Sequence, residues 1–138
     1  MSCKDVLEFA KENPVCFLAI LDGEQPRVRA FLTVLFDDDR IYFTTGATKN
    51  VFKQLSTNPK VELCYCSRDF SKMMRITGEI EIVADYAKKQ RLIDERDYLK
   101  NFKADDPQFI LLRLSRGKAR FWTMADNMKE NELEVVGL

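Results

Sequence analysis

The chain contains no histidine among its 138 residues. This absence excludes a Ser-His-Asp or Cys-His nucleophile, a histidine general base, and zinc or haem held by histidine. The four cysteines, at positions 3, 16, 64 and 66, form no C-x-x-C pair of the kind used in redox and zinc sites. Cys64 and Cys66 share one face of a strand-like run, so we expect packed free thiols there and no metal site. Chemistry at this protein therefore needs a cofactor or carboxylates, and no side chain is assigned as catalytic.

A net charge is also missing, because 22 lysines and arginines balance 22 aspartates and glutamates. No global positive field therefore favours nucleic acid. No stretch approaches the roughly 18 consecutive apolar residues that a membrane span requires. The N-terminal segment MSCKDVLEFAKEN carries acidic residues and lacks the apolar core of a secretory signal. We expect a cytoplasmic protein that binds neither nucleic acid nor a membrane.

The composition that is present is typical of a globular protein, with 46% hydrophobic and 32% charged residues. These fractions differ from those of disordered chains, and the length suits one domain with its own core. We therefore predict a single domain spanning residues 1–138.

Short apolar or alternating segments bounded by turn residues predict a fold that is mainly β. Strands are expected at residues 15–21, 27–36, 40–45, 60–66, 73–83, 109–115 and 118–124. Asp22-Gly23 predicts the first hairpin turn, and Arg116-Gly117 predicts the last one. Antiparallel strands in this order favour closure into a small barrel, because closure removes exposed sheet edges.

Residues 73–83 show the clearest alternation in the chain. Their apolar face is formed by Met74, Ile76, Ile80 and Ile82. Gly78 interrupts this face and predicts a bulge or a sharp bend, as barrel corners require.

Three short helices are expected between the strands. Ser2 is a suitable N-cap for the first, Thr48 for the second and Asp85 for the third, which should extend to Tyr98. Asn-Pro pairs end the first two helices. The predicted fold class is mainly β (α+β), an antiparallel barrel of six to seven strands with three peripheral helices.

An anion site is predicted between the second strand and the N-terminus of the second helix. Arg27 and Arg29 lie on one face of the strand, and the hydroxyl-rich loop of residues 44–48 leads to Lys49 in the first helical turn. A helix N-terminus attracts anions through its free N–H groups and its partial positive charge. Two surface arginines beside an ordinary helix cap would give the same pattern, so the residues alone leave both interpretations open.

The order of these motifs resembles the pyridoxamine 5′-phosphate oxidase-like family of FMN-binding split barrels. A P-x-x-R strand is followed by an acidic turn, and then by Y-F-T-T-G-x-T-K-N before a helix that ends in N-P. An M-R-I-T-G-E segment and the R-F-W ending of the last strand follow in the same order as in the family. The similarity covers residues 5–124, which is most of the chain.

The resemblance implies a homodimer of antiparallel split barrels, with FMN in a groove between the two subunits. Arg29 and Lys49 match the family's contacts to the FMN phosphate, and Thr48 matches a hydroxyl contact beside them. Met73 matches a position near the flavin ring, and Trp122 matches an aromatic position that approaches the cofactor from the partner chain. The strand residues that match contacts along the flavin and its ribityl chain are Ala30, Phe31, Leu32, Phe43, Thr44 and Thr45.

The function implied by the resemblance is that of a small FMN-dependent oxidoreductase with a reduced nicotinamide donor and a small-molecule substrate. The Arg-x-His motif of the pyridoxamine phosphate oxidases is missing, which argues against that specific activity. One alternative is a non-catalytic flavin-binding or carrier protein. Another is a reductase that uses the deazaflavin F420, whose polyglutamyl tail would need more basic positions than Lys49 and Lys53.

Overall fold

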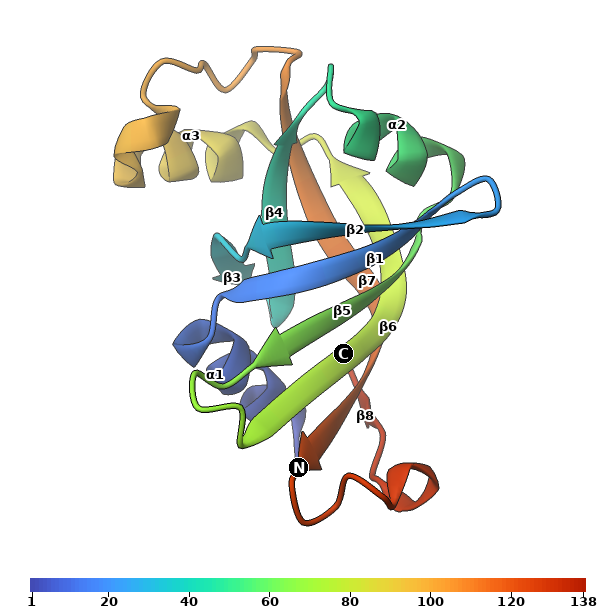
Figure 1. The fold of residues 1–138 in the computed structure, drawn as a ribbon. Helices are drawn as coiled ribbons and strands as arrows, with labels where there is room; N and C mark the ends of the chain where they lie inside the picture. Colours follow the sequence, from blue (N-terminus) through green and yellow to red (C-terminus); the bar gives the residue numbers. More distant parts are fainter.

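The computed structural model describes residues 1–138 and consists of one eight-stranded sheet with helices packed around it (Figure 1). Its elements in chain order are α1 (Cys3–Glu12), β1 (Val15–Asp22), β2 (Gln25–Leu32), β3 (Leu35–Asp37), β4 (Arg40–Gly46), α2 (Asn50–Thr57), β5 (Lys60–Cys66), β6 (Lys72–Val83), α3 (Tyr86–Glu95), η1 (Asp97–Leu99), β7 (Phe109–Thr123), η2 (Glu130–Glu132) and β8 (Val136–Gly137). This architecture confirms the predicted mainly β (α+β) class, an antiparallel split barrel, with eight strands instead of six to seven. None of its helices combines the length and the apolar character that crossing a membrane would require.

The sheet curls so that its two edge strands are consecutive in sequence. The strand order is β2-β1-β5-β6-β7-β4-β3, with β8 paired to β7. Between the two edges the chain has only Thr33 and Val34. The Thr33 N–H donates to the Pro14 carbonyl at 2.8 Å, and the Val34 N–H donates to the Tyr42 carbonyl at 3.1 Å. The first bond joins the chain to the segment before β1, and the second joins it to β4, on the other side of the sheet. The strand predicted at residues 27–36 is therefore divided here into β2 and β3.

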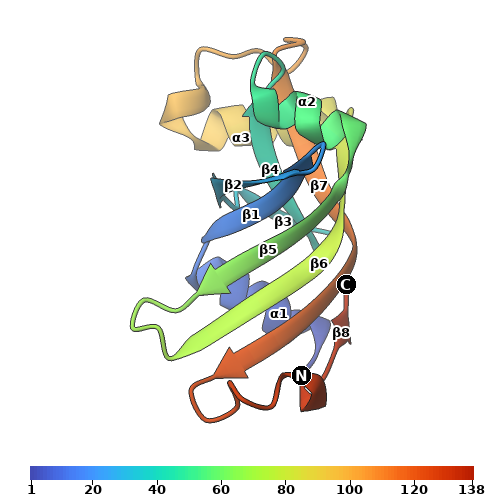
Figure 2. The same ribbon diagram turned by 45° about the vertical axis from the view of Figure 1, so that its right-hand side comes forward.

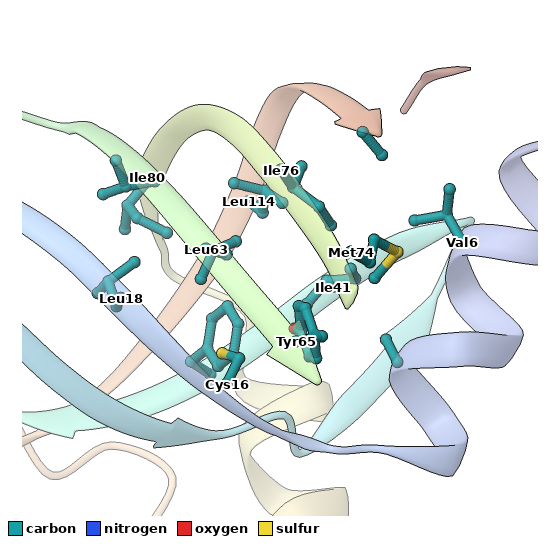
Figure 3. Packing of buried hydrophobic residues seen from close by; sticks show 14 of the residues in the cluster. Val6, Cys16, Leu18, Ile41, Leu63, Tyr65, Met74, Ile76, Ile80 and Leu114 are labelled. Atoms are coloured by element: carbon teal, nitrogen blue, oxygen red, sulfur yellow. The ribbon is translucent and has the colours of Figure 1, made fainter. Parts of the chain in front are cut away.

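Two apolar cores lie on opposite faces of this curved sheet. Inside the barrel, Leu18, Leu63, Ile76 and Leu114 from four strands pack together, and α1 covers one end of them (Figure 3). A smaller cluster lies beneath α3 and η1 and contains Leu92, Leu99 and Leu111, among others. β4 and β7 contribute to both clusters, so they are buried on both faces. Figure 2 shows α2 and α3 near one end of the long strands and α1 near the other.

All four cysteines are free thiols, and only Cys16 is fully buried. Burial raises the pKa of the Cys16 thiol to about 11. Cys64 and Cys66 are half-buried, with their Sγ atoms 3.9 Å apart on one face of β5. Burial and the neighbouring thiol raise the pKa of Cys64 to about 11 as well, so both Cys16 and Cys64 are protonated near neutral pH.

The predicted hairpin at Arg116-Gly117 is wrong, because β7 runs without interruption from Phe109 to Thr123. Arg116 has a positive φ of 54°, a backbone conformation that is common in turns, but it lies within a continuous strand. The pairing between β6 and β7 shifts register between Thr77 and Glu79, so the bulge predicted at Gly78 is confirmed. Beyond this shift the alternation weakens, and Ile82, which was expected inside, is 53% exposed.

Replacing Gly78 with alanine is expected to lower the free energy of unfolding by about 1–3 kcal/mol, because a Cβ there would overpack the bend. The added Cβ would lie 2.8 Å from the Ser115 carbonyl oxygen, which belongs to the backbone of β7 and cannot rotate away. Denaturant unfolding of the variant measures the loss. Gly137→Ala is the control, because a Cβ at Gly137 meets nothing within 4 Å. Equal stability of the two variants would contradict the prediction.

Candidate functional site

A cavity of about 600 Å³ opens between β2, the end of β4, the start of α2 and η1. In Figure 1, α2 and α3 lie at the upper end of β4, and β2 crosses β4 below them. The cavity is lined by Arg29, Ala30, Phe31, Leu32, Val34, Thr44, Thr45, Thr48, Lys49, Asn50, Val51 and Tyr98. Most of the residues predicted to contact a cofactor therefore line one cavity, although they come from segments that are well separated in sequence.

The position of Arg29 follows from the pairing of β2 with β1. Arg29 lies opposite Leu18, whose side chain is buried in the barrel, so Arg29 projects on the inner face at the open edge of the sheet. Its guanidinium donates only to the neighbouring Val28 carbonyl, at 3.0 Å, and forms no ion pair. Arg27, by contrast, lies 3.3 Å from the Asp22 carboxylate. Of the two arginines predicted on this face, only Arg29 lines the cavity with an uncompensated charge.

The predicted N-cap Thr48 is wrong, because α2 begins one residue later with Lys49 in the cap position. No side chain accepts a hydrogen bond from the first turn of α2. Side chains do cap the other two α-helices, with Ser2 accepting from Asp5 N–H in α1 and Asp85 accepting from Lys88 N–H in α3. The first-turn N–H groups of α2 therefore have no side-chain acceptor at the end of the helix that lines the cavity.

Thr45 supplies an independent sign of a missing ligand atom. Its side chain lines the cavity, and its Oγ1 atom is buried without any hydrogen-bond partner. A buried hydroxyl left unpaired costs about 1–3 kcal/mol. A ligand oxygen placed in the cavity would accept or donate the bond that the protein does not provide.

The charge of the cavity favours an anion. Arg29 and Lys49 are its only charged lining residues, and neither forms an ion pair with an acidic side chain. Three threonines and Asn50 add further hydrogen-bonding groups. Two cations, a helix N-terminus and hydroxyls together suit a phosphate group, whose oxygens accept several hydrogen bonds at once.

Three of the predicted cofactor residues lie outside this cavity. Phe43 is only 1% exposed and packs edge-on behind Phe31, with ring centroids 5.6 Å apart. Met73 and Trp122 are direct cross-strand neighbours on β6 and β7. They share the outward face of the sheet, and neither lines the cavity of the same chain. Within one subunit, the structure therefore separates Met73 and Trp122 from Arg29 and Lys49.

Four lining residues were not predicted from the sequence, namely Val34, Asn50, Val51 and Tyr98. Asn50 and Val51 follow Lys49 directly, so the displaced helix start explains why they were missed. Tyr98 comes from η1, which is far from the other residues in sequence. No local pattern marks it, and only the packing of η1 beside β4 brings it to the cavity.

A larger hollow, of about 850 Å³, lies between α3 and residues 100–105. Its charged lining residues are of both signs: Lys100, Lys103, Asp94 and Asp105. It contains no buried polar atom that lacks a partner. Elsewhere, no group of three or more cysteine, aspartate or glutamate side chains is placed to hold a metal ion. The cavity at Arg29 and Lys49 is therefore the better candidate site.

The outward face of β1 and β2 is apolar over its whole length. The cross-strand pairs on this face join Val15 to Leu32, Phe17 to Ala30, Ala19 to Val28 and Leu21 to Pro26. The large side chains among them are 39–64% exposed. A contiguous apolar surface of this kind typically marks a protein–protein contact. Ala30 and Leu32 also line the cavity, so this apolar face borders the candidate site.

Comparison with known proteins identifies the family of the chain. The family model described as pyridoxamine 5′-phosphate oxidase matches residues 4–123. The chain is 32% identical to a NimC/NimA family protein from Clostridium acetobutylicum, with a TM-score of 0.82 over 99% of this chain and 92% of that one. Comparison with curated protein sequences gives no significant match.

More distant structures share the fold alone. A pyridoxamine 5′-phosphate oxidase-related, FMN-binding protein from Nostoc punctiforme has a TM-score of 0.71 at 14% identity, covering 98% of this chain and 95% of that one. A haem-binding protein from Mycobacterium smegmatis has a TM-score of 0.72 at 15% identity, covering 88% of this chain and 54% of that one. Because the family model matches most of the chain, the chain belongs to the pyridoxamine 5′-phosphate oxidase family.

Proposed function

We propose that this protein binds FMN in the cavity at Arg29 and Lys49 and acts as a small flavin-dependent oxidoreductase. The observation that carries the proposal is the combination of two unpaired cations, an uncapped helix N-terminus and the unpartnered Thr45 hydroxyl around one cavity. A volume of about 600 Å³ also lies within the range of roughly 300–1,000 Å³ that is usual for small-molecule sites.

The chain's own residues would hold the cofactor and orient it. Arg29, Lys49 and the first turn of α2 would hold the phosphate, with Thr48 beside them. Thr45 would pair its buried hydroxyl with the ribityl chain, and β2 would place its backbone along the ring. When bound, a flavin supplies the transfer of a hydride or of single electrons, so no catalytic side chain is required. The donor we propose is a reduced nicotinamide.

The apolar face of β1 and β2 supports a homodimer with the flavin at the subunit interface. A second copy on this face would cover the exposed side chains of Phe17 and Val28 and would close the edge of the cavity. Met73 and Trp122 lie on the same outward side of the sheet, which would face the partner in a symmetric dimer. Trp122 is only 7% exposed within its own chain, where the Arg75 guanidinium lies over its ring. The distance of Met73 and Trp122 from the cavity of their own chain is thus consistent with contacts to the flavin of the other subunit.

The lining residues favour FMN over two other cofactors of this fold. No histidine, cysteine or methionine lines the cavity, which leaves only Tyr98 as a possible axial ligand for haem. Lys49 is its only lysine, so the cavity offers no extended basic track for the polyglutamyl tail of F420.

The absorbance spectrum of the purified protein tests the proposal. We expect flavin bands, and we expect the pigment released by denaturation to be FMN. A colourless protein that does not bind added FMN would overturn the proposal. Anaerobic addition of NADH or NADPH then separates an enzyme from a carrier: bleaching of the flavin bands supports the oxidoreductase, whereas a flavin that stays oxidised supports a carrier.

Replacing Thr45 with valine is expected to weaken FMN binding about tenfold without reducing the stability of the FMN-free protein. The hydroxyl has no hydrogen-bond partner within the protein, so its loss removes no hydrogen bond from the FMN-free protein. Thr33→Val is the matched control, because the buried Thr33 hydroxyl is hydrogen-bonded to Tyr65 at 2.8 Å. We expect that control to lose stability and to keep its FMN affinity. Fluorescence titration and thermal denaturation measure both quantities, and the same pattern in both variants would contradict the assignment.

A further inference from the structure

A third hollow, of about 310 Å³, lies between the outward face of β5, β6 and β7 and the C-terminal segment. It shares no residue with the cavity at Arg29 and Lys49. Its lining residues are Glu62, Arg75, Thr77, Lys118, Arg120, Trp122, Glu130 and Val135. Three of them are cations and two are carboxylates, so positive charge is in excess.

The sheet places two arginines in direct opposition in this hollow. Arg75 on β6 and Arg120 on β7 are cross-strand partners. Like charges directly opposite each other destabilise a sheet, unless an anion lies between them. Arg120 forms no ion pair and no hydrogen bond through its side chain, and neither does Lys118. Of the three cations in the hollow, Arg120 and Lys118 therefore have no acidic partner, and an added anion would offset their charge.

Arg75 is already oriented for such an anion. Its guanidinium carbon lies 3.9 Å from the centre of the Trp122 ring, which fixes the plane of the guanidinium. The carboxylate of Glu130, in η2, accepts a hydrogen bond from Arg75. The Glu130 side chain is 55% exposed, so water screens its ion pair with Arg75, and another anion can replace the Glu130 carboxylate. The protein's own carboxylate thus already occupies one position of an anion site.

We propose that Arg75 and Arg120, with Lys118 beside them, form a subsite for the carboxylate or phosphate group of a small-molecule substrate, and that Glu130 occupies this subsite when the substrate is absent. In a symmetric dimer, the outward face that carries this hollow would lie toward the partner subunit, so the bound substrate would lie near the flavin of that subunit. The role of the anion as a substrate rests on the proposed FMN function. The binding of the anion does not.

Titration of the full-length protein with benzoate and phenyl phosphate tests the subsite, and benzamide serves as the neutral control. Trp122 is the only tryptophan, so its fluorescence reports on the hollow directly, and calorimetry gives the affinity. Both anions should bind and change the fluorescence, whereas benzamide should not. Arg120→Gln should weaken binding of the anions about tenfold. Glu130→Gln should strengthen it about two- to fivefold, because the competing carboxylate is removed.

Two controls separate this inference from the proposed function. Arg68→Gln removes one exposed charge outside the hollow and should change nothing. The double variant Arg29→Ala, Lys49→Glu should keep anion binding while FMN binding is measured in the same samples. Equal binding of benzamide and benzoate, or no effect of Arg120→Gln, would overturn the subsite even if FMN binds. Loss of the FMN proposal alone would leave the binding of the two anions unchanged.

Discussion

A variant that carries both Arg29→Ala and Lys49→Glu is expected to lose FMN binding while its fold and stability are retained. Charge-assisted contacts to a phosphate are worth about 1.5–3 kcal/mol each, so the two changes should weaken binding by roughly a hundred- to ten-thousand-fold. A glutamate at the start of α2 should stabilise the FMN-free protein slightly, because a carboxylate there interacts favourably with the helix dipole. The two measurements are fluorescence titration with FMN and thermal denaturation without it.

The matched control for this variant is Arg27→Ala with Lys53→Glu. It makes the same change of charge on the same strand and the same helix, but Arg27 pairs with Asp22 and neither position lines the cavity. FMN affinity should be nearly unchanged in the control. If both double variants lose FMN equally, the effect is a general one of net charge. If neither loses it, the phosphate lies elsewhere.

Phe17→Asp is expected to convert a dimer into monomers and to weaken FMN binding with it. Phe17 lies midway along the apolar face of β1 and β2 and is 50% exposed in the single chain. A symmetric interface would bury the new carboxylate twice, once from each subunit. At about 2 kcal/mol for each copy, the dimer dissociation constant should rise by roughly a thousandfold. Light scattering coupled to size-exclusion chromatography measures the mass, and flavin content is determined on the same fractions.

Ile82→Asp is the control for the dimer, because Ile82 is 53% exposed but lies at the end of β6, outside the apolar face of β1 and β2. This variant should stay dimeric and keep its flavin. A wild-type protein that is monomeric at micromolar concentration would contradict the proposed interface. A Phe17→Asp monomer that retains its full FMN affinity would contradict the contribution of the partner subunit to the site.

Local rules were sufficient for much of the fold. Ser2 caps the first helix as predicted, and Asp5 completes a capping box with it, because a cap depends only on residues within one helical turn. The bend at Gly78 was predictable, since a glycine that interrupts an apolar face indicates a bulge. The first hairpin, at Asp22-Gly23, also follows from its own turn residues.

The same rules failed where distant partners decide the outcome. Arg116-Gly117 has the residues of a turn, yet β6 is long enough to pair with both halves of β7 and keeps them in one strand. Thr48 is a good cap by type, but the backbone hydrogen bond from Lys49 N–H to the Gly46 carbonyl delays the helix by one residue. At Arg116-Gly117, pairing with many residues of β6 outweighed the local turn preference, whereas at Thr48 a competing backbone hydrogen bond within the loop did so.

By itself, the sequence predicted the family and the approximate place of the candidate site. The order of the strand motifs and the helix start was enough to predict Arg29, Thr48 and Lys49 as residues of one site, and all three line the cavity. Only the tertiary structure decided that Thr45 has an unpaired hydroxyl, that Tyr98 completes the cavity, and that Trp122 lies on another face. The physical reason is that burial and pairing depend on which distant segments meet, and the curl of the sheet sets those meetings.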